Sequence, residues 1–301
     1  TVTELADGTY DRKLENVLAL QDEIAAAVAG ALRATLEGEP APAPRPANGA
    51  AYNALLQGRF FAERGSREDL EKAAGWFEKA LEADPTSARA LVGLAAVHAL
   101  QADLGFLTAD DGYGKARAEA ERALRLDPGL AEAHARLGSV LMFLDRDWKG
   151  ADAAFRRALE LEPGNPAAVH GAATLAAVLG RLDEALALAR REVELDPLAT
   201  AAHGNLGVYA YYADRLDETE AAFRKALELN PGYSSAHLYL GLVHLARSRP
   251  AGALAEMEKE PEPVWREMGL ALAYHAAGRK AEADAALAGY ETSFGKEAAF
   301  E

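Results

Sequence analysis

Cysteine is absent from all 301 residues of the chain, and aromatic residues account for only 7% of it. Without cysteine, the protein can form no disulfide framework, thiol nucleophile, thiolate metal site or iron–sulfur site. Half of the residues are hydrophobic by a broad count, which argues against a disordered chain. Alanine is abundant, and it is both the best helix former and small enough to let helices approach closely. The composition therefore predicts closely packed helices.

Basic residues are also scarce relative to acidic ones, at 32 against 47, which gives a formal charge of −15. Phosphate binding requires clustered Lys and Arg, so we expect no nucleic-acid partner. An acidic membrane surface would repel the chain for the same reason. The sequence has no positively charged apolar leader and no apolar run near the ~20 residues that span a bilayer. We therefore expect a cytoplasmic protein that does not bind membranes.

Five segments share one pattern, in which a short helical run leads to an acidic residue or asparagine and then to proline. They are Ala80–Pro85, Ala123–Pro128, Ala158–Pro163, Glu192–Pro197 and Ala226–Pro231. The spacings between their prolines are 43, 35, 34 and 34 residues. Because proline ends a helix and forces the preceding residue into an extended conformation, each segment predicts the start of a new helix axis. A period of 34 residues with two earlier insertions indicates structural repeats.

Two amphipathic helices are predicted in each repeat, and the first carries a Leu-Gly pair near its middle. The glycines of these pairs are Gly138, Gly207 and Gly241. A glycine inside a helix costs ~1 kcal/mol relative to alanine, so its repetition requires a reason. We expect the second helix of the pair to cross the first at close range there.

This pattern resembles the tetratricopeptide repeat family, whose second helix carries small, aromatic and small residues before the final proline. The repeat that begins at Thr200 supplies the residues of the family pattern: His203, Leu206, Gly207, Ala210, Thr219, Phe223, Ala226 and Pro231. Further pairs begin near Ala51, Ala88, Ala131, Pro166, Ser234 and Val264. The resemblance implies an all-α, right-handed superhelical solenoid of about seven helix pairs over residues 51–301.

The segment before the repeats has a different character. Leu14–Leu36 is predicted to form one amphipathic helix, and residues 38–50 form a linker rich in proline and alanine. The segments Thr9–Arg12 and Leu18–Ile24 resemble the end of a bacterial TolB-like domain, and this resemblance covers residues 1–37. It implies that the chain is a fragment from which most of a preceding domain is missing.

Three features depart from the family pattern. Glu192 occupies a site that is normally small, so we expect a splayed turn or a side chain that extends outward. Pro261 and Pro263 should shorten the helix that follows Pro250. The insertion Gln101–Gly114 should lengthen the loop of the second pair.

The seven histidines do not indicate a metal site. His134, His203 and His237 fall on the same site of their repeats, where the family places a large packing residue. No two histidines stand four apart on one helix face with a third ligand converging. Asp103 and the pair Asp110-Asp111 lack the spacing of a calcium loop. We therefore predict no metal.

The sequence also carries no catalytic motif. Acidic pairs such as Glu218 with Glu220, or Glu258 with Glu260, are predicted to be solvated surface. A working acid–base pair requires a cleft that excludes water, and nothing indicates one. No phosphate-binding loop, nucleophile elbow or dinucleotide fingerprint is present. We predict that the protein is not an enzyme and needs no cofactor.

The family resemblance implies that the first helix of each pair lines a concave groove. Aromatic side chains exposed along such a groove are favoured anchors for a partner, although they could equally pack between neighbouring pairs. The Lys and Asn pattern that clamps a peptide carboxylate in some relatives is not found at matching sites. The predicted groove residues are Phe143, His170, Asn205, Tyr211, Tyr212, Tyr239 and Leu242.

We therefore expect a non-catalytic scaffold that binds a peptide or helix of a partner protein in the groove. One occupant could be the helix Leu14–Leu36 of the same chain or of a second copy, which would give self-association. The alternative is the regulatory arm of a larger bacterial signalling enzyme or transcription factor. Its cyclase, kinase or DNA-binding domain would then lie outside this fragment.

Overall fold

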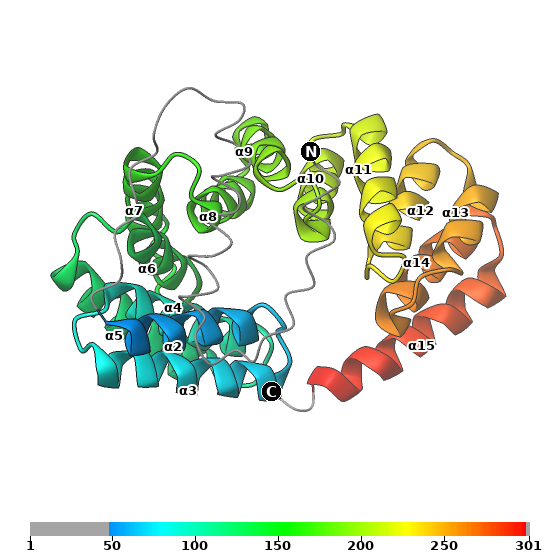
Figure 1. The fold of residues 1–301 in the computed structure, drawn as a ribbon. Helices are drawn as coiled ribbons and strands as arrows, with labels where there is room; N and C mark the ends of the chain where they lie inside the picture. The colour runs from blue at the N-terminus through cyan, green and yellow to red at the C-terminus, as the bar shows by residue number, and fades with distance from the viewer. Residues whose placement is uncertain (1–47, 299–301) are drawn as a thin grey trace, which may run out of the picture. The chain divides into compact units, whose positions relative to one another are not determined.

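The computed structural model describes residues 48–298, and every regular element in this range is an α-helix (Figure 1). The helices follow one another as seven pairs, in which even labels mark first helices and odd labels mark second helices. The pairs are α2 (Gly49–Ala62) and α3 (Arg67–Ala83); α4 (Ala88–Asp103) and α5 (Ala109–Leu126); α6 (Ala131–Phe143) and α7 (Trp148–Leu161); α8 (Pro166–Val178) and α9 (Leu182–Leu195); α10 (Thr200–Tyr212) and α11 (Leu216–Leu229); α12 (Ala236–Ala246) and α13 (Pro250–Met257); α14 (Pro263–Ala276) and α15 (Lys280–Ala298).

The prediction of an all-α fold built from seven tetratricopeptide-type pairs is confirmed for the described residues. The predicted helix Leu14–Leu36, the predicted TolB-like segment 1–37 and most of the predicted linker 38–50 lie outside them. No helix in the described range combines the length and apolar character needed to cross a bilayer.

The contacts divide the chain into two compact units, residues 1–144 and 145–301. The first unit contains α2 to α6 and the second contains α7 to α15. Within each unit, helices contact their neighbours along the chain, as expected of stacked repeats.

The acidic residue or asparagine before each proline has a definite role in the turn. Four of these residues accept a hydrogen bond from the backbone N–H two positions later, each at 3.0 Å, with φ angles of −138° to −140°: Asp84, Asp127, Asp196 and Asn230. Such short side chains stabilise turns by bonding to the local backbone. The predicted extended residue before proline is therefore confirmed, and its side chain holds the turn closed.

The glycines of the first helices lie against large side chains of the second helices. A Cβ atom on Gly207 would lie 2.6 Å from the ring of Phe223 on α11. A Cβ atom on Gly241 would lie 2.6 Å from Met257 on α13. At these two positions the predicted close crossing is confirmed, because only glycine leaves room for the partner side chain. Gly138 is buried in α6.

Two departures from the repeat pattern have different outcomes. The helix after Pro250 is short, as predicted, with eight residues in α13 against fourteen in α11. The insertion Gln101–Gly114 does not form a long loop, because its two ends extend α4 and α5. Thr108 begins α5 by accepting a hydrogen bond from the N–H of Asp111 at 3.1 Å. Asp110 and Asp111 thus lie in the first turn of a helix that Thr108 caps, which the repeat pattern did not predict.

Candidate functional site

Six of the seven predicted groove residues lie on first helices of the second unit. His170 lies on α8, Asn205, Tyr211 and Tyr212 on α10, and Tyr239 and Leu242 on α12. We call the surface formed by the exposed side chains of α8, α10 and α12 the first-helix face. Phe143 is the exception: it ends α6 in the first unit, is 45% exposed, and its ring centroid lies 5.7 Å from that of Tyr113.

The three predicted tyrosines form one aromatic cluster. The ring centroid of Tyr211 lies 6.0 Å from that of Tyr212 and 5.5 Å from that of Tyr239, with both pairs meeting edge to face. Tyr239 also stacks on Phe223, with a centroid distance of 4.8 Å and an interplanar angle of 10°. Burial raises the pKa of Tyr239 above its usual value, and the neighbouring Tyr212 hydroxyl adds to this shift. Tyr239 therefore packs between pairs, whereas Tyr212 is 59% exposed and available to a partner.

His170 and Asn205 meet at a carboxylate that was not among the predicted groove residues. The Nδ1 atom of His170 lies 3.2 Å from Oε1 of Glu192, and the Nδ2 atom of Asn205 lies 3.5 Å from Oε2. The same Asn205 nitrogen lies 3.3 Å from His170 Nδ1. Glu192 extends from the last turn of α9, so these three residues bring α8, α9 and α10 together in one polar cluster.

The sequence contained a signal for this cluster. At the position of Glu192 in the repeat, other second helices carry an alanine with no exposed surface: Ala80, Ala123, Ala158 and Ala226. The glutamate was recognised as a departure but was not predicted as part of the site. Its side chain is 17% exposed, and it reaches the first-helix face between α8 and α10. The turn that follows has the same geometry as the corresponding turns, with φ of −140° at Asp196 and a hydrogen bond of 3.0 Å from the N–H of Leu198, so the predicted splayed turn is wrong.

Two hydroxyl groups continue the polar cluster along the first-helix face. The hydroxyl of Tyr209 lies 3.2 Å from Oγ1 of Thr174, which links α10 to α8. Burial raises the pKa of Tyr209, and the charge of Glu192 contributes in the same direction. The phenol therefore stays neutral at physiological pH and can donate or accept a hydrogen bond.

Leu242 contributes more to packing than to the open surface. It is partly buried against a cluster formed by Leu238, Ala253, Met257 and Ala273. Among the predicted residues of the second unit, His170 and Tyr212 are exposed, whereas Asn205, Tyr211, Tyr239 and Leu242 are half-buried.

Three other histidines have structural roles. The Nε2 atoms of His134 and His203 each lie 3.0 Å from the carbonyl oxygen of the proline six residues earlier. His237 differs, since its Nδ1 atom lies 2.9 Å from Oε2 of Glu256 on α13. Within residues 48–292, no group of three His, Asp or Glu side chains is arranged to hold a metal ion.

The expectation that acidic pairs are solvated is wrong for three of the four residues. Glu218 pairs with Arg190 of α9, and this hydrogen bond lowers the pKa of the carboxyl. Glu220 likewise has a lowered pKa because Arg247 donates to it. Glu260 is only 1% exposed. Only Glu258 is exposed to solvent as predicted.

Glu260 caps the N-terminus of α12. Its carboxylate accepts hydrogen bonds from the N–H of Ser235 at 2.9 Å and from that of Leu238 at 3.3 Å. Ser235 itself gives no side-chain cap, because its backbone is left-handed with φ of 69°. A carboxylate at a helix N-terminus satisfies free N–H groups and interacts favourably with the helix dipole.

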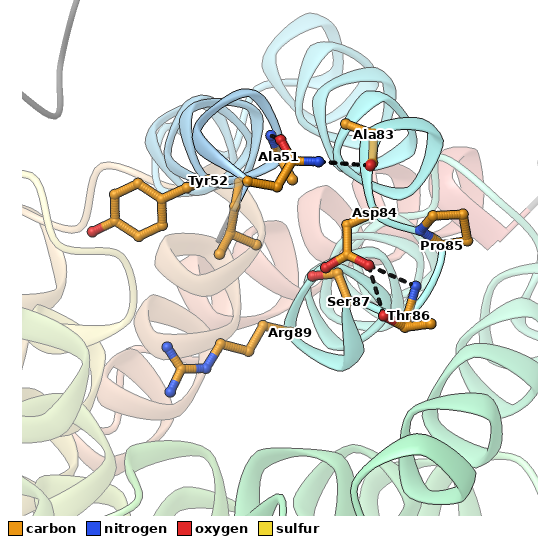
Figure 2. A pocket seen from close by; sticks show the side chains of 10 residues that line it. Ala51, Tyr52, Ala83, Asp84, Pro85, Thr86, Ser87 and Arg89 are labelled. Carbon is orange, nitrogen blue, oxygen red and sulfur yellow. Dashed lines mark hydrogen bonds between the residues drawn. The ribbon is translucent and has the colours of Figure 1, made fainter. Parts of the chain in front are cut away.

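A pocket of the first unit lies at the turn between α3 and α4 and is an alternative location for a site (Figure 2). It has a volume of about 490 Å³, and Tyr52 and Arg89 lie at its edge. Its polar groups at the turn already have partners: Asn48 donates to the carbonyl of Ala83 at 2.7 Å, and Asp84 accepts from the hydroxyl of Thr86 at 2.7 Å. These bonds close a repeat turn, so the pocket is explained by the fold.

Comparison with known proteins points to one family. Residues 144–200 and 205–263 match the family model of the tetratricopeptide repeat. No curated protein matches the chain. Among solved structures, the chain is similar to PilW, a widely conserved type IV pilus biogenesis factor, with a TM-score of 0.56 and 19% identity over 71% of this chain and 93% of PilW.

Two further structures show the same likeness. A tetratricopeptide repeat protein from Parabacteroides merdae has a TM-score of 0.52 and 15% identity over 81% of this chain and 93% of its own. A thermophilic tetratricopeptide repeat protein of Thermus thermophilus has a TM-score of 0.52 and 21% identity over 65% of this chain and all of its own. At these identities the likeness establishes the fold.

Proposed function

Since the chain carries tetratricopeptide repeats in residues 144–200 and 205–263, we propose that it is a non-catalytic module that binds a peptide or helix of a partner protein on the first-helix face. Proteins with this repeat generally mediate protein–protein interaction. The observation that carries the proposal is that α10 holds both an exposed tyrosine, Tyr212, and one member of the polar cluster, Asn205. Asn205 and Tyr212 stand seven residues apart on α10, which is about two turns.

The composition of this face supports a protein ligand. Tyrosine offers apolar area together with a hydroxyl group and loses little conformational freedom on binding. His170 and Asn205 provide donors and acceptors that can fix the register of a peptide. A segment that lies along α10 would contact both groups.

The competing expectation, a regulatory arm of a larger signalling enzyme or transcription factor, is not favoured by any contact in residues 48–298. The residues that resemble a TolB-like domain lie outside that range. Self-association through Leu14–Leu36 lies outside it as well, and it remains a prediction.

The test is a comparative pull-down with the full chain as bait and quantification by mass spectrometry. The baits are the wild type, Tyr212→Ala and, as a matched control, Phe60→Ala, which removes an exposed aromatic ring from α2 of the first unit. We expect one or more proteins to be retained by the wild type and by Phe60→Ala but lost with Tyr212→Ala. Circular dichroism checks that all three are equally folded. Equal retention by all three baits would show that binding does not use the first-helix face.

A further inference from the structure

We infer that the polar cluster of Glu192, His170 and Asn205 is a subsite for a lysine or arginine side chain of the bound segment. This inference rests on the proposed function, and it adds the chemistry of the partner. The three residues, from α8, α9 and α10, meet at one carboxylate.

The carboxylate of Glu192 is incompletely satisfied by its neighbours. A carboxylate offers about four acceptor positions, and here one histidine and one long contact from an amide approach it. His170 Nδ1 can donate to Glu192 or accept from Asn205, but it cannot do both. Within the described residues, no lysine or arginine forms an ion pair with Glu192.

Neighbouring acidic residues of the second unit do form ion pairs with arginine. Glu218 is paired with Arg190, and Glu220 with Arg247 and Arg224. Glu192 is as shielded as these side chains, with 17% exposure against 28% for Glu218 and 19% for Glu220. The basic neighbour of Glu192 is a histidine and not a lysine or arginine, so its remaining acceptor positions can take a cation, and a charge-assisted hydrogen bond in such a place is stronger than at an open surface.

Stability gives no reason for an acid at this position. The equivalent alanines in four other repeats are fully buried. A glutamate there places a charge in a half-buried site. Residues that depart from the local pattern in this way are expected at functional sites.

The geometry also constrains the partner segment. Asn205 and Tyr212 are two helical turns apart, which corresponds to ~10 Å along α10. A segment that fills both subsites must carry a cation and an apolar or aromatic residue at that separation. This corresponds to about seven positions in a helix, or about three in an extended peptide.

The test uses a displayed library of random twelve-residue peptides, selected on the immobilised full chain and sequenced. The variants are Glu192→Gln, which removes the charge but keeps the shape, and Glu194→Gln as a matched control. Glu194 lies two residues away, is exposed and pairs with Arg191. A third variant, Tyr212→Ala, removes the aromatic subsite.

We expect peptides selected on the wild type and on Glu194→Gln to be enriched in Lys or Arg at a fixed distance from an apolar residue. With Glu192→Gln this enrichment should fall to the level of the starting library. The best wild-type peptide, resynthesised, should bind Glu192→Gln about 10- to 100-fold more weakly, as expected for one charge-assisted hydrogen bond.

Two negative outcomes are distinguishable. If peptides are selected through Tyr212 but show no excess of Lys or Arg, or keep that excess with Glu192→Gln, the cation subsite is wrong and the binding face stands. If no peptide is selected on the wild type, the binding of short segments is itself refuted, and the subsite with it.

Discussion

At the scale of single residues, Glu260 shows how a side chain can compensate for a missing cap. Ser235 precedes α12, but its left-handed backbone prevents it from capping the helix, and a carboxylate from beyond α13 takes that role. The residue is almost fully buried although no lysine, arginine or histidine forms an ion pair with it in the described part of the chain. Its hydrogen bonds to backbone N–H groups compensate for the loss of water.

We predict that Glu260→Ala lowers the free energy of unfolding by about 1–3 kcal/mol, since it leaves N–H groups of α12 without acceptors. Urea denaturation followed by circular dichroism measures the change. Glu258→Ala, two residues away and exposed, is the control and should change stability by less than about 0.5 kcal/mol. Equal effects of the two substitutions would refute the capping role.

Gly207 is the second residue whose role can be tested alone. We predict that Gly207→Leu destabilises the protein by about 1–3 kcal/mol, because any side chain would collide with the ring of Phe223. Gly75, in α3, is a matched helical glycine, since no atom lies within 4 Å of the position that its Cβ would occupy. Gly75→Leu should instead stabilise by up to about 1 kcal/mol through helix propensity. Melting temperatures of both variants check the prediction, and a loss in both would show that steric fit is not the cause.

At the scale of helices, charged side chains connect neighbouring repeats of the second unit. Arg247, just after α12, donates hydrogen bonds to Asp217 and Glu220 of α11. Arg190 of α9 makes two hydrogen bonds of 2.8 Å to Glu218 of α11. Bidentate and multiple pairs of this kind are better defined than single surface ion pairs. They join α9 to α11, and α11 to the residue that follows α12.

The hydrogen bond from Arg247 to Glu220 on α11 makes the stability of the fold depend on pH. The hydrogen bond from Arg247 lowers the pKa of Glu220 in the folded state. A lowered pKa stabilises the fold above the pKa of the unfolded glutamate, and this contribution is lost as the pH falls through the folded pKa. Arg247→Met should therefore be less stable than the wild type at pH 7, and the difference should narrow below pH ~4. Urea unfolding at pH 7 and pH 3 measures it; a difference that stays constant would contradict the prediction.

Glu192, which lies between α8 and α10, is a position where a substitution should stabilise the protein. Glu192→Ala restores the small residue found at the same position of four other second helices, and it removes a half-buried charge. We predict a gain of about 0.5–2 kcal/mol in the free energy of unfolding. Thermal denaturation checks this gain. A clear loss of stability would mean that the polar cluster holds the helices together and is retained for the fold.

At the scale of the whole molecule, the described residues form repeats that contact their neighbours within each compact unit. In such arrays, stability is approximately the sum of repeat and neighbour terms. We predict that Gly207→Leu accelerates amide hydrogen exchange most strongly in α10 and α11 and less in α14 and α15. Exchange measured by mass spectrometry in wild type and variant tests this. A uniform increase over all helices would indicate that the array unfolds as one cooperative unit.

Much of the fold follows from local signals in the sequence. Proline and the acidic residue before it end a helix by stereochemistry and by a bond to the chain two residues on, so the turns at Asp84 or Asn230 need no distant partner. The glycine and aromatic positions repeat with the same period, so the pairing of α10 with α11 was predictable too. The insertion at Gln101–Gly114 was misjudged because the caps at Thr108 and Asp111 extend helices that the repeat pattern does not include.

The sequence alone thus determined the helical pairs, their number and the exclusion of cysteine-based chemistry, because these depend on local propensity, on period and on composition. Only the tertiary structure decided which side chains meet. Glu192 could be recognised as a departure, but its approach to His170 and Asn205 depends on the stacking of α8, α9 and α10. The burial of Tyr239 and the exposure of Tyr212 were decided in the same way, because both are tyrosines on first helices and only the packing of Phe223 beneath one of them tells them apart.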